Sequence, residues 1–160
     1  MTLALSAMLA AFSFAELGLS GVNGGEALRV ESDRCDFDRK RGVALFEGSV
    51  RVDYDPGYVM CADRLFVFFT GTNEVDRIAA DGAVAVTNGN RTGSCESAVF
   101  LRKSGQIEMR GGETSLARLS ETGANEVAGR RIRFWLDAGQ VEVEGAEILV
   151  DKGGRSIKEL

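Results

Sequence analysis

Residues 44–52 alternate between apolar and polar side chains, as a half-buried β-strand does. The apolar parity carries Ala44, Phe46, Val50 and Val52. Charged residues such as Glu47 and Arg51 fall on the opposite parity. The same pattern returns over 78–86, where the matching apolar positions are Ile78, Ala80, Val84 and Val86. The chain therefore contains a repeated amphipathic strand.

Glycines mark further copies of this strand. Gly48, Gly82, Gly111 and Gly145 each follow a charged residue that itself follows an apolar one, at spacings of 34, 29 and 34 residues. Such regular spacing indicates an internal repeat. The apolar positions ahead of the last two glycines are Ile107, Met109, Val141 and Val143. After these two glycines the apolar positions move by one residue, which is the change that a β-bulge introduces.

A second kind of segment lies between the glycine-marked strands, over 59–67, 93–101 and 125–134. Each begins polar or mixed and becomes apolar after a small or acidic residue, where we expect the strand to turn a corner. These residues are Asp63, Ser97 and Gly129. Twenty glycines and a single proline fit many strands joined by tight turns. We expect an all-β fold built as a stack of mainly antiparallel strand repeats.

The N-terminal segment 3–15 is apolar, uncharged and ends in small residues, which is typical of a secretory signal peptide and its cleavage site. No lysine or arginine precedes it, in departure from that rule. An uncleaved membrane anchor is the alternative, although Glu16 interrupts the run short of the ~20 residues that a spanning helix needs. We expect a signal-like segment over 1–15, a linker over 16–27, one domain over 28–151 and a tail over 152–160.

Composition and charge argue against several kinds of activity. The net charge of −5 speaks against nucleic acid as a partner, and the basic residues 39–41 are expected at a solvated hairpin tip. The chain has no histidine, which is the usual general base and the commonest metal ligand. The acid pairs Asp36/Asp38 and Asp53/Asp55 flank expected turns and are interpreted as solvated. We expect no catalytic residue, no metal site and no cofactor, and hence not an enzyme.

Two of the three cysteines occupy equivalent positions in adjacent copies. Cys61 and Cys95 lie thirteen residues after Gly48 and Gly82, respectively. If those segments are neighbouring strands, their separation of ~4.8 Å is within the reach of a disulfide, which an oxidising compartment would permit. The alternative is two buried thiols in place of aliphatic side chains. Cys35 stays unpaired in both cases, and the spacing fits no zinc motif.

The segments 46–52, 61–65 and 78–84, with the later copies and the signal-like N-terminus, resemble a known family. Over about 28–151 the chain is similar to the OstA-like domain of the lipopolysaccharide transport proteins, LptA and its relatives. The resemblance implies a twisted, open β-jellyroll of two facing sheets. It also implies a periplasmic protein that binds the lipid A acyl chains of lipopolysaccharide between the sheets. Edge-strand pairing with other Lpt components, or head to tail with itself, would bridge the inner and outer membranes.

On this interpretation the inward parity of the strands forms a lipid-binding groove. Its residues are Ala44, Phe46, Val50, Val52, Ile78, Ala80, Val84, Val86, Ile107, Met109, Val141 and Val143. A closed core would need the same side chains, so the sequence leaves open whether the interior is filled. Two other hypotheses remain: a membrane-anchored, LptC-like component of the exporter, and a structural β-stack that polymerises through its edges without a ligand.

Overall fold

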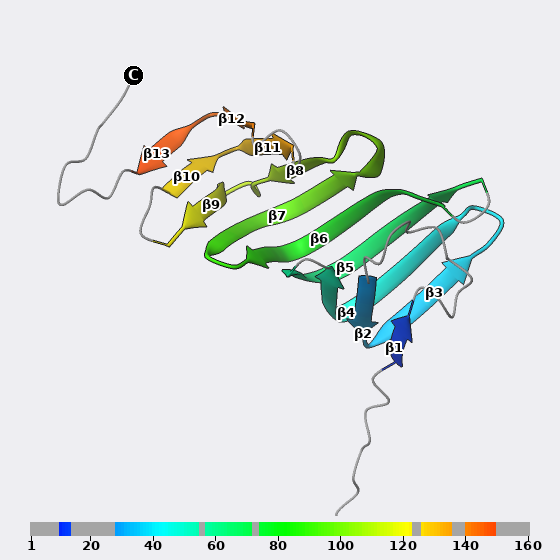
Figure 1. Ribbon diagram of the computed structural model, residues 1–160. Coiled ribbons are helices and arrows are strands. Elements are labelled where there is room, and N and C mark those ends of the chain that lie inside the picture. The colour runs from blue at the N-terminus through cyan, green and yellow to red at the C-terminus, as the bar shows by residue number, and fades with distance from the viewer. Residues whose placement is uncertain are drawn as a thin grey trace, which may run out of the picture.

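The computed structural model describes residues 10–13, 28–54, 57–71, 74–122, 126–135 and 140–149. This part of the chain forms thirteen strands and one 3₁₀ turn, η1 (Arg102–Ser104) (Figure 1). The strands are β1 (Ala10–Ser13), β2 (Leu28–Ser32), β3 (Arg34–Asp38), β4 (Val43–Tyr54), β5 (Tyr58–Thr70), β6 (Glu74–Asn88), β7 (Arg91–Leu101), β8 (Gln106–Arg110), β9 (Ala117–Glu121), β10 (Glu126–Gly129), β11 (Arg131–Trp135), β12 (Val141–Glu144) and β13 (Glu147–Leu149). Their pairings are antiparallel, which confirms the all-β expectation.

Each of the long strands β4 to β7 passes through two sheets. The pairing of β4 with β5 shifts register between Glu47 and Val50, and the pairing of β6 with β7 shifts between Asp81 and Val84. Before its shift β4 pairs with β3, and after it β4 pairs with β2. The hydrogen-bonded network is therefore folded along a line of corners into two facing layers.

We call these layers sheet I and sheet II. Sheet I consists of β3, the first half of β4, the second half of β5, the first half of β6, the second half of β7, β8, β11 and β12. Sheet II consists of β1, β2, the second half of β4, the first half of β5, the second half of β6, the first half of β7, β9, β10 and β13. The sheets join at the corners and are open along the side where the hairpin turns lie. This arrangement is the twisted, open β-jellyroll that the resemblance implied.

The corners in β4 and β6 depend on left-handed backbone. Gly48 and Gly82 have φ of 79° and 81°, and the residues that follow them, Ser49 and Ala83, have φ of 46° and 47°. In both places two residues face one residue of the neighbouring strand, which is a β-bulge. Glycine suits the first position because it adopts positive φ at no steric cost. At Gly82 a side chain would also collide with the carboxylate of Asp63.

All four repeat glycines lie where the chain passes from sheet I to sheet II. Gly111 follows β8 and Gly145 follows β12, so the repeat predicted the corners correctly. The return corners predicted at Asp63, Ser97 and Gly129 also lie at the passages from sheet II to sheet I. The one-residue bulge expected after Gly111 is wrong, because the crossing there takes the six residues 111–116.

Inward side chains beside the corners form a packed core. Phe46, Leu65 and Met109 of sheet I are at most 1% exposed, and Val50 of sheet II is 2% exposed. All four belong to one cluster of buried residues that draws on both sheets. Burial of apolar surface from two facing layers holds the sheets together on this side.

Candidate functional site

The interior opens on the side opposite the corners, towards the C-terminal strands. A cavity of about 320 Å³ lies there between the two sheets. Its apolar walls include Val86, Leu119 and Val127 from sheet II, and Met109, Phe134 and Val141 from sheet I. Its polar lining includes Asn88, Arg91 and Gln140. A mostly apolar concavity with a few polar groups is the usual character of a ligand site.

Gly93 and Met109 separate the packed core from the cavity. Gly93 lies in β7 between Val86 of β6 and Leu119 of β9, in a row of otherwise apolar side chains. A Cβ atom at Gly93 would lie 3.0 Å from the terminal methyl of Met109, which reaches across from sheet I. The missing side chain therefore leaves room for Met109, and the space beyond it stays open.

The twelve predicted groove residues all lie in strands, on the inward face. Seven are buried in the core: Ala44, Phe46, Val50, Val52, Ala80, Val84 and Met109. Four are half-buried and packed against that core: Ile78, Val86, Ile107 and Val143. Val141 differs, because it lies in the edge strand β12 and is 48% exposed. Of the twelve, Val86, Met109 and Val141 line the cavity.

Sequence reasoning missed several cavity residues. Leu119, Val127 and Phe134 line the cavity. Val127 and Phe134 lie in the segment 125–134, which was recognised as a copy but gave no groove residue, and Leu119 lies outside the recognised copies. Alternation within 117–121 and 131–135 places Leu119 and Phe134 on the apolar parity, so the strand pattern alone could have found both. Gly93 carries no such signal, since its role depends on its neighbours across the sheet.

The disulfide between Cys61 and Cys95 is a wrong prediction. Both cysteines are free, Cys61 being exposed and Cys95 buried. Strand β6 lies between their strands, so they are two strand spacings of ~4.8 Å apart, beyond the reach of a disulfide. The side chains of Cys61 and Cys95 also point to opposite faces of the sheet. The reason is the length of the hairpins: three residues connect the paired Tyr54 and Tyr58, whereas two residues connect the paired Asn88 and Arg91. The shorter hairpin reverses the parity of the strand that follows it.

Burial also sets the chemistry of the inner thiol. Cys95 lies opposite Val84 on the inward face, and desolvation there raises the pKa of Cys95 to about 12. A hydrogen bond with the backbone of Arg110 works in the opposite direction but does not outweigh the burial. Cys95 is therefore a protonated, apolar side chain of the core at neutral pH.

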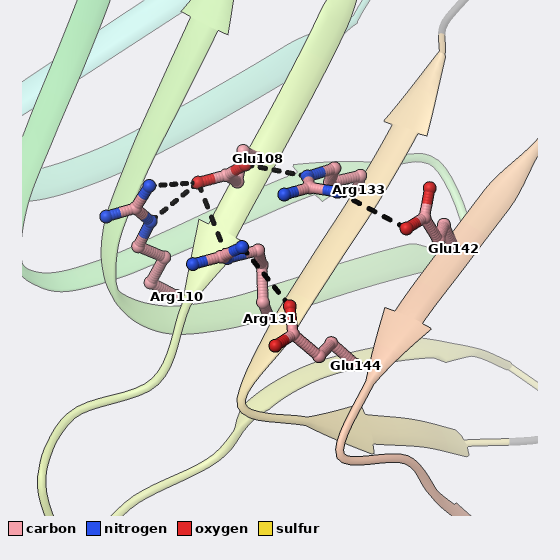
Figure 2. Close-up of polar contacts among 6 residues, drawn as sticks. All are labelled: Glu108, Arg110, Arg131, Arg133, Glu142 and Glu144. Atoms are coloured by element: carbon pink, nitrogen blue, oxygen red, sulfur yellow. Dashed lines mark hydrogen bonds and ion pairs between the residues drawn. The ribbon is translucent and has the colours of Figure 1, made fainter.

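An ionic network braces the outer face of the cavity wall (Figure 2). Glu108 of β8 accepts hydrogen bonds from Nε of Arg110 at 2.6 Å and from Nε of Arg133 at 2.8 Å. Arg131 lies 3.7 Å from the same carboxylate. Arg133 and Arg131 reach on to Glu142 and Glu144 of β12, at 3.3 and 3.2 Å. The network thus spans β8, β11 and β12, whose inner faces carry Phe134 and Val141.

Burial and hydrogen bonding oppose each other at Glu108, whose side chain is 16% exposed. Burial of the carboxylate works to raise its pKa, but the hydrogen bonds from Arg133 and Arg110 outweigh the burial. The pKa of Glu108 therefore lies below its ordinary value. The ionised form is the one that holds the three strands together.

Three of the four acids in the predicted pairs have partners at the surface, and the fourth, Asp55, lies outside the described residues. Asp53 forms an ion pair with Arg51 at 2.9 Å, and Asp36 forms one with Arg34 at 2.8 Å. Asp38 accepts backbone hydrogen bonds at the exposed turn 39–42. Within the described ranges, no group of three or more cysteines and carboxylates could hold a metal ion. Asp38 thus caps an exposed turn, and the two ion pairs lie on the outer faces of their strands.

The N-terminal and C-terminal expectations lie mostly outside the described residues, which omit 1–9, 14–27 and 150–160. Within the signal-like segment, Ala10–Ser13 forms β1, which pairs with β2. The part of the chain that the structure describes holds no helix of sufficient length and apolarity to cross a membrane.

Two facing sheets around an apolar cavity on the open side define an open β-jellyroll. A profile of the family described as LptA/(LptD N-terminal domain) LPS transport protein matches residues 29–152, so the chain belongs to that family. The crystal structure of LptH, the LptA-homologous periplasmic component of the lipopolysaccharide transport device of Pseudomonas aeruginosa, is similar with a TM-score of 0.68 and 12% identity. The match covers 78% of this chain and 95% of LptH, and it supports the fold. No curated protein sequence matches the chain.

Proposed function

We propose that this chain is a periplasmic, non-enzymatic carrier that holds the acyl chains of lipopolysaccharide in the cavity between its two sheets. The opening of the apolar interior beside Phe134 and Val141 is the observation that carries the proposal. Family membership supplies the class of ligand. Burial contributes about 0.8 kcal/mol per CH₂ group, so apolar contact would dominate the affinity.

The net charge of the protein favours transfer of lipopolysaccharide from a partner protein over binding of lipopolysaccharide from free solution. A net charge of −5 repels a phosphate-bearing ligand at a distance. Arg91, which lines the cavity, lies 3.6 Å from the carboxylate of Glu121, which partly neutralises the positive charge of Arg91. The ligand would therefore be delivered by a partner that presents the acyl chains to the open side.

Photo-crosslinking tests the position of the ligand. A benzophenone side chain at Phe134, in protein made in a lipopolysaccharide-producing host, is expected to capture the lipid. The matched control is Val59, which is half-buried on the outer face of sheet II and is expected to capture none. If folded protein captures lipid at neither position, the proposal is wrong. Phe46 is a poor probe site because only 1% of it is exposed.

A charge in the groove tests the role of apolar contact. Leu119→Glu places a carboxylate on the cavity wall and is expected to reduce the lipid that copurifies with the protein by about tenfold. Val59→Glu adds the same charge on the outer face and is expected to leave the lipid content unchanged. Equal lipid content in the two variants would contradict binding in the cavity.

The bridging role rests on the strands at the ends of each sheet. Sheet I ends in β3 and β12, and edge strands offer unpaired backbone groups to another chain. Light scattering of lipid-free protein is expected to show a mass that grows with concentration. A constant monomer mass would remove self-association and leave lipid binding intact. Filaments with no lipid uptake under any condition would instead favour the structural β-stack.

The membrane-anchored alternative depends on the N-terminal segment 1–15. Mass determination of the mature protein is expected to show loss of this segment, which includes β1 and would leave β2 as the edge of sheet II. Its retention would favour the LptC-like, anchored component over the exported carrier.

A further inference from the structure

The outer face of sheet I carries an apolar patch at its N-terminal end. Strand registers place two rows of outward residues side by side across β4 to β7, and β6 contributes Arg77 to one row and Ala79 to the other. The apolar patch consists of Val43, Leu45, Phe66, Phe68, Val99 and Leu101. Five of these side chains are half-buried and Leu101 is 38% exposed, although no described residue packs over them from another layer. A contiguous apolar area of this kind marks an interaction surface.

Aromatic side chains form the centre of the patch. The rings of Phe66 and Phe68 stack with 6.4 Å between their centroids. The guanidinium carbon of Arg77 lies 4.1 Å from the centroid of Phe68. This cation–π contact holds a positive charge directly within the apolar surface. The patch thus combines apolar contact area with a cation.

A basic edge borders the patch along the open side of sheet I. The turns β3–β4, β5–β6 and β7–β8 follow one another along this edge (Figure 1). Its basic residues are Arg39, Lys40, Arg41, Arg77, Arg102 and Lys103. Its acidic residues are Asp38, Glu74 and Asp76. Six basic side chains against three acidic ones make this edge positive in a chain whose net charge is −5.

The outer face of sheet II has a different character. The row across its long strands runs through Arg51, Cys61, Ala85 and Ser94. Arg51 forms an ion pair with Asp53 on the same face. This face offers no comparable group of large apolar side chains within the described strands. The two outer faces of the molecule therefore differ: the outer face of sheet I carries large apolar side chains, and the outer face of sheet II does not.

We propose that the apolar patch and the basic edge dock this protein on the surface of a bilayer that contains anionic phospholipids. Peripheral membrane binding needs apolar side chains that enter the boundary between headgroups and acyl chains, together with basic side chains that meet anionic headgroups. The patch supplies the first and the edge supplies the second. The excess negative charge elsewhere on the chain orients the basic edge towards the membrane. Docking is independent of a ligand in the cavity, which lies on the other face of sheet I.

Vesicle flotation tests the docking. The full chain is expected to float with vesicles of phosphatidylcholine and phosphatidylglycerol in equal parts at low ionic strength. It is expected to stay behind with vesicles of phosphatidylcholine alone. Failure to float with the anionic vesicles, or equal flotation with both, overturns the proposal.

Two variants of the patch separate its contribution from folding. Leu101→Ser and Phe66→Ser are each expected to lower the bound fraction several-fold without loss of the β-sheet circular dichroism signal. Leu101 is the more exposed of the two and keeps the test valid if Phe66→Ser unfolds. Val59→Ser, on the outer face of sheet II, is the matched control and is expected to bind as the unchanged protein does. Unchanged binding of a folded patch variant overturns the proposal.

A charge reversal tests the basic edge. The triple variant Arg39→Glu, Lys40→Glu and Arg41→Glu is expected to weaken binding to anionic vesicles by at least roughly tenfold. The control has the same net charge and carries Lys152→Glu, Arg155→Glu and Lys158→Glu instead. Equal losses in the two triple variants would assign binding to net charge and overturn the docking site. Leu119→Glu is expected to float normally, which keeps this test separate from lipopolysaccharide binding.

Discussion

The two ends of the interior differ although one repeat builds both. At the N-terminal end Phe46 and Leu65 are at most 1% exposed, whereas at the C-terminal end Val141 is 48% exposed. The N-terminal strands β4 to β7 contain 11 to 15 residues each and pass through both sheets. The C-terminal strands β8 to β13 contain three to five residues and stop at the corner. The interior is packed between the continuous strands, and it opens beside the ends of the short C-terminal strands.

The largest expected effect comes from the packed end. Phe46→Ala is expected to lower the free energy of unfolding by about 3–5 kcal/mol, because it removes a buried ring and leaves a cavity. Val141→Ala, at the open end, is the control and is expected to cost less than about 1 kcal/mol. Urea denaturation of both variants measures the difference. Similar losses would mean that the two ends are equally packed in solution.

The next effect concerns the charges that hold the open end together. Glu108→Gln is expected to lower the free energy of unfolding by about 1–3 kcal/mol at neutral pH, since three arginines lose their shared carboxylate. Because the pKa of Glu108 is below its ordinary value in the folded state, its contribution is present above the unfolded pKa. It is lost as the pH falls through the folded pKa.

Denaturation across the acid range tests the sign of this dependence. The unchanged protein is expected to lose more stability on acidification than Glu108→Gln does. Parallel pH curves for the two proteins would show that the network does not stabilise the open end.

A smaller effect is expected from closing the open end. Gly93→Leu places a side chain against the terminal methyl of Met109 and towards the cavity, so it is expected to lower the free energy of unfolding by about 1 kcal/mol. Lipid that copurifies with the variant is expected to fall. Thermal melting and lipid extraction measure the two quantities. A large loss of stability with normal lipid content would place the ligand elsewhere.

The smallest effect concerns the cysteines and leaves stability unchanged. Cys61 is expected to react with a thiol reagent in the folded protein, whereas Cys95 reacts after unfolding. Burial and a pKa raised to about 12 both protect Cys95. Mass analysis of the labelled peptides identifies the site. Rapid labelling of Cys95 would mean that the packed end opens in solution.

Local features of the sequence predicted the corners and the inward face. Gly48 and Gly82 could be recognised because their positive φ is a local requirement that selects glycine. The pairing of Cys61 with Cys95 could not be excluded in the same way, since it depends on the length of a hairpin and on an intervening strand. The openness beside Phe134 depends on the distance between two sheets, and no local pattern encodes that distance. The apolar character of the cavity wall was therefore predictable from the sequence, whereas the shape of the cavity was not.

The corner repeat also determines how the molecule could change in length. From Gly48 to Gly82 the chain adds two strand segments to each sheet within 34 residues. Because strands lie ~4.8 Å apart, one such unit extends the stack by about 10 Å. A duplicated unit inserted at a corner would keep the inward and outward parity of every later strand. The length of a protein with this architecture therefore changes in steps of one repeat unit. After each added unit, the edge strands at both ends would be the same, so partners would bind the same edge strands.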